Sequence, residues 1–200
     1  MQKNWTLKKV YPWLIVIVGL VGLVASLILT HDTLAISANP NYIPSCNINP
    51  IISCGNVINY KGDDIFGLPY PFYGVAAFAA ATTVGVALLA GAQFKKWFWL
   101  SYQTAVTLGL AGAYLLLLKS IYRIHALCPF CLSVDVVTTV LFWYTTLYNA
   151  DRGLIDKRLP NNRWYKLLRK HHLDILILWL LALAVAIIKH FWYYYGKHLF

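Results

Sequence analysis

The sequence predicts an all-α integral membrane protein with a four-helix transmembrane bundle, a fifth transmembrane helix and an outer cap loop bearing a short helix. Of the 200 residues, 60% are apolar and only 12% are charged. A soluble domain of this size carries about 25% charged residues, so a soluble protein is excluded. The apolar residues are also gathered into runs of a length that suits a lipid bilayer.

Five such runs are separated by polar segments. A helix rises 1.5 Å per residue, so each run can cross the hydrocarbon core. A single span in lipid must satisfy its own backbone hydrogen bonds, which makes helix the only conformation available to it. The first run is expected to be a retained span, because no small-residue cleavage site closes it. The predicted spans are Val10–Thr30, Pro71–Ala92, Phe98–Leu118, Pro129–Asn149 and Leu173–Tyr194.

The basic residues give the predicted orientation. Five spans with a cytoplasmic N-terminus place 12 of the 17 Lys and Arg residues inside, as the positive-inside rule expects, and leave the C-terminus outside. The formal charge of +10 is thereby explained by topology, and nucleic acid is not expected as a partner. The outer five are Lys61, Lys119, Arg123, Lys189 and Lys197.

All four cysteines fall on the outer side in this topology, where disulfides form and persist. Cys46 and Cys54 lie in the long segment 31–70, which is expected to cover the outer mouth of the bundle. Within it, Asn49-Pro50 resembles the start of a short surface helix. Its apolar side would carry Ile48, Ile51, Ile52 and Val57, and Gly55 would end or bend it.

Cys128 and Cys131 form a Cys-x-x-Cys motif where the fourth span begins. The amides and dipole of a helix N-terminus stabilise a thiolate, and Pro129 suits the first helical turn. Arg123 and His125 lie just upstream and are expected to add positive potential. Two other interpretations stay open, namely static structural disulfides and a zinc site, although the seven-residue spacing of the loop pair is unusual for zinc.

The cysteine-bearing stretches resemble the vitamin K epoxide reductase family over roughly Tyr11–Asn149. The resemblance lies in Cys46-Asn-Ile-Asn-Pro-Ile-Ile-Ser-Cys54-Gly55, in Phe66-Gly-Leu-Pro69 with Gly74, and in Cys128-Pro-Phe-Cys131. It implies a four-helix bundle around a quinone, menaquinone or ubiquinone, which accepts electrons from Cys128 and Cys131. Cys131 would react with the quinone, Cys46 would exchange with a protein partner, and Cys54 would pass electrons to Cys128.

The same resemblance implies which residues contact the quinone. We expect Cys131, Asp135, Tyr70, Phe72 and Tyr60 to do so. Asp135 lies one turn beyond Cys131, and an ionisable residue inside a span is a functional candidate, although a carboxyl that merely bonds a neighbouring helix is the alternative. Asn59, Tyr60, Tyr70 and Asp135 differ from the residues that family members usually carry at these positions.

We therefore expect a single membrane domain over residues 1–200, with a family-like core over about 10–150. It would be a quinone-dependent thiol–disulfide oxidoreductase of the bacterial type without a fused thioredoxin domain. It would lie in a plasma or inner membrane and oxidise a separate extracytoplasmic thioredoxin-fold, DsbA-like protein. Two alternatives remain: a reductase of vitamin K epoxide, and a membrane scaffold or transporter with static disulfides.

Overall fold

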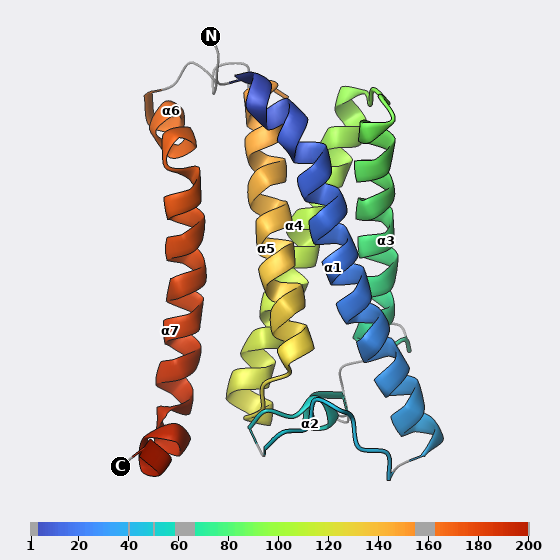
Figure 1. The fold of residues 1–200 in the computed structure, drawn as a ribbon, viewed down its shortest axis with the longest axis vertical. Coiled ribbons are helices and arrows are strands. Elements are labelled where there is room, and N and C mark those ends of the chain that lie inside the picture. Colours follow the sequence, from blue (N-terminus) through green and yellow to red (C-terminus); the bar gives the residue numbers. More distant parts are fainter. Residues whose placement is uncertain (1–3, 40, 50, 59–66, 155–162, 200) are drawn as a thin grey trace.

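The computed structural model describes residues 4–39, 41–49, 51–58, 67–154 and 163–199. The fold is a bundle of long helices, and residues 41–49 and 51–58 form a cap at one end of it. Four helices pack side by side: α1 (Asn4–Ala38), α3 (Tyr70–Leu89), α4 (Lys96–Lys119) and α5 (Pro129–Asp151). The fifth long helix, α7 (His172–Leu199), runs along one side of this bundle (Figure 1). Within the described residues five helices are long and apolar enough to cross a membrane, which confirms the predicted multi-pass membrane class.

The two ends of the bundle differ. The N-terminus, the turn between α3 and α4, and the basic helix α6 (Arg163–Lys170) lie at one end. The short helix α2 (Cys54–Ile58) and the C-terminus lie at the other (Figure 1). The cysteines thus sit at the end opposite the clustered Lys and Arg residues. This is the two-sided arrangement that the charge count predicts. We call the end with the cysteines the outer end of the bundle and the opposite end the inner end.

α1 and α3 approach closely because glycines line their interface. A Cβ atom on Gly22 would lie 2.5 Å from the ring of Phe78, and one on Gly74 would lie 2.6 Å from the Ser26 hydroxyl. Small residues allow such close contact between membrane helices, where association depends on packing and hydrogen bonds. This interface fixes α1, whose outer end forms part of the site.

Aromatic side chains fill the inner half of the bundle. Tyr11 of α1 stacks on Tyr148 of α5 at 4.2 Å, and Trp99 of α4 closes the group. The hydroxyl of Tyr11 donates to Thr145 at 3.0 Å, so a buried polar atom is paired. The inner end is therefore solidly packed, and the chemistry lies at the other end.

The predicted spans are confirmed, but α1 is longer than expected. It continues past Thr30 to Ala38, about two turns beyond the predicted end, and carries His31 and Asp32 on a helix rather than in a loop. α4 also continues, through one turn of π-helix, η1 (Ser120–Ile124). His125 then ends it in the left-handed conformation with φ of 57°. Single turns of π-helix such as η1 often occur at functional sites.

The predicted start of the short cap helix is wrong. The helix begins at Cys54, so Gly55 is its second residue rather than its end. The side chain of Asn49 does not cap a helix there. It accepts hydrogen bonds from the amides of Ile51 and Ile52 at 3.0 and 2.7 Å, which makes a turn that leads into an extended segment. Ile51 becomes buried and Ile48 stays exposed, so the expected common apolar side is not formed.

Candidate functional site

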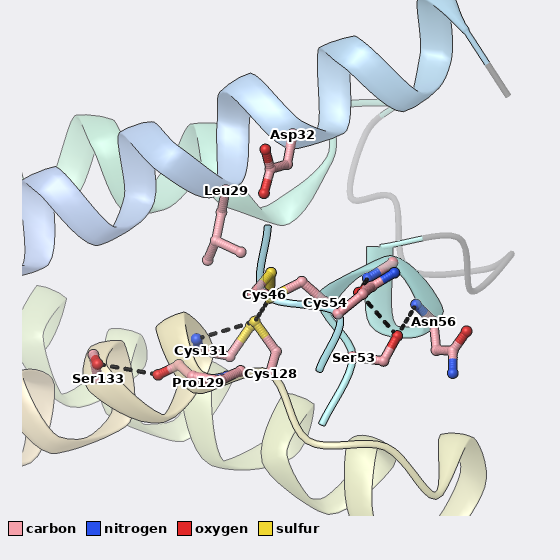
Figure 2. The surroundings of a disulfide bond; sticks show 12 residues. Leu29, Asp32, Cys46, Ser53, Cys54, Asn56, Cys128, Pro129, Cys131 and Ser133 are labelled. Atoms are coloured by element: carbon pink, nitrogen blue, oxygen red, sulfur yellow. Dashed lines mark hydrogen bonds between the residues drawn. A yellow bond between two sulfur atoms is a disulfide. The ribbon is translucent and has the colours of Figure 1, made fainter. Parts of the chain in front are cut away.

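The sulfur atoms of the loop and of α5 meet beneath the cap. Cys46 and Cys54 are joined as a disulfide, and Cys128 and Cys131 are free thiols. The sulfur of Cys128 lies 3.2 Å from that of Cys54, although the two residues are 74 positions apart (Figure 2). Cys54 and Cys128 are 0% and 2% exposed. A free thiol thus contacts one sulfur of a buried disulfide.

A short parallel β-bridge between Ile52 and Leu127 sets this register. The amide of Leu127 donates to the carbonyl of Ile51 at 2.6 Å, and the amide of Ser53 donates to the carbonyl of Leu127 at 3.0 Å. Each cysteine follows within two residues of the bridge. The backbone pairing therefore brings Cys54 beside Cys128 before any side chain contributes.

Asn47 holds the turn between the two loop cysteines. Its side-chain oxygen accepts from the amide of Gly55 at 3.0 Å and from the hydroxyl of Ser53 at 3.1 Å. The Ser53 oxygen in turn accepts from the amide of Asn56 at 3.2 Å, which caps the first turn of α2. These hydrogen bonds give the cap a defined structure around the disulfide.

Cys128 occupies the N-cap position of α5, as the Cys-x-x-Cys motif predicts. Its sulfur accepts from the amide of Cys131 at 3.3 Å, and Pro129 fills the first helical position. The hydrogen bond from the Cys131 thiol lowers the pKa of Cys128. Burial opposes this, and the backbone amides of Cys131 and Phe130 lower the pKa further. Cys128 therefore carries more thiolate character than an ordinary thiol.

This arrangement can perform thiol–disulfide exchange. A thiolate attacks a disulfide sulfur through a mixed disulfide, and Cys54 already lies between Cys46 and Cys128. Attack by Cys128 on Cys54 would release Cys46, and the reverse attack by Cys46 would release Cys128. The zinc alternative loses two of its four thiolates to the loop disulfide.

An apolar cavity of about 150 Å³ adjoins the thiols on the membrane side. Its walls come from α1, α2, α3, α4, η1 and α5, so it lies at the outer end of the bundle interior. Aliphatic side chains dominate, with a few polar groups, which is the usual character of a site for a largely apolar ligand. Those polar groups include Cys131, Asp135, Tyr70, Ser120 and Ser26.

The cavity contains three of the five predicted quinone contacts. Cys131, Asp135 and Tyr70 line it, with Asp135 buried one turn below Cys131. Phe72 does not line it, because α3 begins at Tyr70 and its first turn directs Tyr70, Pro71 and Gly74 to the cavity instead. Tyr60 and Asn59 lie outside the described residues.

Arg123 and His125 do not line the cavity either. Both are exposed, and the ring of His125 lies 6.1 Å from that of His190 on α7. The π-helical turn places Arg123 beside Lys119 and Tyr122 in a separate groove. The groups that lower the pKa of Cys128 are the Cys131 thiol and the amides of Cys131 and Phe130, not these two side chains.

Sequence reasoning missed the outer turns of α1. Leu29 and Thr33 line the cavity, and Asp32 is buried beside it. An ionisable residue next to an apolar run is a usable signal, but a predicted span that ends at Thr30 leaves Asp32 in the loop. The β-bridge at Leu127 and the Ser120 hydroxyl, which donates to the carbonyl of Ala126, had no local sequence signal.

Comparison with curated proteins finds no match. The model of the vitamin K epoxide reductase family matches residues 13–146, which include all four cysteines and two thirds of the chain. The match ends before α6 and α7. The chain therefore belongs to the vitamin K epoxide reductase family and to its class of membrane thiol–disulfide oxidoreductases that act with quinones.

Proposed function

We propose that this protein oxidises thiols of an extracytoplasmic protein and passes the electrons to a membrane quinone. The contact between Cys128 and Cys54, 3.2 Å apart beneath the cap, is the observation that carries this proposal. It brings the loop disulfide beneath the cap next to the free thiols Cys128 and Cys131, which line the cavity. A scaffold with static disulfides has no need for a free thiol pair in contact with a disulfide.

Electrons would move in two exchanges. A reduced partner attacks Cys46, and Cys54 leaves as a thiolate; a second partner thiol then resolves the mixed disulfide. Cys54 attacks Cys128 of an oxidised Cys128–Cys131 pair, and Cys46 attacks Cys54 to release Cys128. The described arrangement, with the loop oxidised and the inner pair reduced, is the product of that second exchange.

The cavity residues fit a quinone ring. Apolar walls would hold it, Cys131 and Asp135 would face it, and Tyr70 would close the outer side. A bound quinone supplies a two-electron, two-proton acceptor. Asp135 would hold or deliver a proton at this point, while the walls would exclude water.

The partner we propose is a thioredoxin-fold protein of the DsbA type. The charge bias favours an orientation with the cap outside the cell. Purified protein should reduce ubiquinone or menaquinone analogues when given such a reduced partner. Removing quinone should convert Cys128 and Cys131 to persistent thiols. If the partner stays reduced with every quinone, or the thiols are unchanged by quinone removal, the oxidase assignment fails. Vitamin K epoxide is the comparison acceptor, since turnover with it alone would favour a reductase.

A further inference from the structure

Asp32 is a buried carboxylate beside the sulfur atoms. It lies on α1 one turn after Leu29, which packs in one cluster with Cys46, Cys54 and Cys128. The Asp32 side chain is 4% exposed. Figure 2 shows its carboxylate among the surroundings of the disulfide, on the part of α1 that faces the cysteines. None of the proposed exchange steps above uses this group.

Within the part of the chain that the structure describes, one oxygen of this carboxylate is engaged and the other is not. Oδ1 accepts from the hydroxyl of Tyr42 at 3.2 Å and lies 3.4 Å from Nδ1 of His31. Oδ2 is buried and has no hydrogen-bond partner among the residues that the structure describes. A buried polar atom left without a partner is destabilising, and more so when the group is charged. Such an atom calls for an explanation, and a catalytic role is one of the few available.

Asp32 also acts on the reactive thiol. Hydrogen bonding from the Cys131 thiol is the main influence on the pKa of Cys128 and lowers it. Burial and the negative charge of Asp32 raise it. A carboxylate close enough to act on a thiol, with a free oxygen, is placed to exchange a proton with it directly or through one water.

We infer that Asp32 is the proton acceptor and donor for disulfide exchange between the cap and α5. This rests on the proposed function, because it assigns a residue to the second exchange described above. As Cys46 attacks Cys54, the Cys46 thiol gives its proton to the Asp32 carboxylate. The Cys46–Cys54 bond forms, the Cys54–Cys128 bond breaks, and Cys128 leaves as a thiolate. Asp32 then returns the proton to Cys128, so the step needs no other reactant.

His31 connects this group to solvent. Its side chain is 74% exposed and neighbours Asp32, so the proton on Asp32 can equilibrate with water outside the buried centre. The hydrogen bond from Tyr42 gives Asp32 a structural role as well. The test must separate this structural role from proton transfer. Among the described residues, the other titratable groups on the two helices that pack against α1 here are Tyr70 and Tyr73 of α3 and Cys128, Cys131 and Asp135 of α5. The neighbouring end of α4 and η1 carries Lys119, Tyr122, Arg123 and His125.

The test uses the full-length chain with Cys131→Ala, which needs neither partner nor quinone. In this parent, Cys128 attacks Cys54 and releases the Cys46 thiol, which a maleimide traps. The trapping rate is measured from about pH 6 to about pH 9.5, a range that spans an ordinary thiol pKa. Asp32→Asn keeps the shape and an acceptor for Tyr42 but cannot carry the proton. Tyr42→Phe removes the same hydrogen bond and leaves the carboxylate.

We expect Asp32→Asn to slow trapping at least about tenfold near pH 7, since positioned acid–base groups contribute about 10²–10⁴. The deficit should shrink to about threefold or less near pH 9.5, where the thiols ionise without help. Asp32→Glu should recover part of the rate, and Tyr42→Phe should keep the profile of the parent. Size-exclusion chromatography in detergent and the helical circular dichroism signal check that each variant folds, and Asp32→Ser replaces Asp32→Asn if that variant does not.

Three results would overturn the inference. One is an unchanged rate in the neutral variants. Another is a deficit that is the same at every pH, which is what a purely structural tie would give. The third is a Tyr42→Phe profile that matches Asp32→Asn. If the parent itself never releases Cys46, the proposed exchange route fails, and the role of Asp32 falls with it.

Discussion

Ile51 anchors the cap to the mouth of the bundle, and its loss should lift the cap from α5. The side chain is 3% exposed and packs with Leu117, Ile121 and Leu127 and with Phe191 of α7. Truncating a buried isoleucine to alanine costs about 2–5 kcal/mol. A surface cap can partly collapse onto the gap, so we take about 2–3 kcal/mol. Because 1.4 kcal/mol is a tenfold change, the open population should rise about 30- to 150-fold.

Hydrogen exchange at the β-bridge measures this opening. The amides of Ser53 and Leu127 are bonded across the bridge, so they exchange only when the cap separates from α5. Ile51→Ala should accelerate both by the factor above. Ile48→Ala, the same substitution in the same loop at a side chain that is 72% exposed, should leave them nearly unchanged. Equal exchange in the two variants would show that Ile51 does not hold the cap and would refute the reasoning.

Three further outcomes follow from the same structure. The loop variants Cys46→Ala and Cys54→Ala should lose oxidation of a protein partner but keep dithiothreitol-driven quinone reduction. The variants Cys128→Ala and Cys131→Ala should lose both activities. Partner oxidation by the loop variants would rule out the cap as electron carrier. A cysteine placed at Gln93, beside Lys95 and Lys96, should react with an impermeant maleimide only from the cytoplasmic side. Labelling of this cysteine in intact cells would contradict the predicted orientation. Gly22→Ala should lower the free energy of unfolding in detergent by about 1–3 kcal/mol, because the new methyl would lie 2.5 Å from Phe78. Gly112→Ala should not lower it, because the space around Gly112 is open, and equal effects would contradict the close α1–α3 contact.

The spans and the inner motif were predictable because each depends on local pattern. Apolar run length fixes a transmembrane helix, and Cys128-Pro129 gives both the N-cap and the first helical residue of α5. The helix register then fixes Asp135 one turn below Cys131, and both line the cavity. Tyr70 also lines the cavity. Its expected contact with a quinone comes from the resemblance rather than from pattern, and it stays a prediction.

The cap could not be predicted in the same way, because a long-range contact determines it. Ile52 pairs with Leu127, 75 residues away, and that pairing draws the segment before Cys54 into an extended form. Asn49 therefore forms a turn just before the Ile52–Leu127 bridge instead of beginning a helix. Asp32 was missed for a related reason, since α1 continues past its apolar run once the cap and α5 cover its outer end.

The contact between the loop disulfide and α5 is the central claim, and a trapped intermediate tests it most directly. Without Cys131, Cys128 has no partner in α5, so it should be found bonded to Cys54 with Cys46 free. The measurement is proteolysis of the oxidised Cys131→Ala protein followed by non-reducing mass spectrometry of the linked peptides. A Cys54–Cys128 peptide pair is the result that the exchange route predicts. Finding Cys54 bonded only to Cys46 under every redox condition would contradict it.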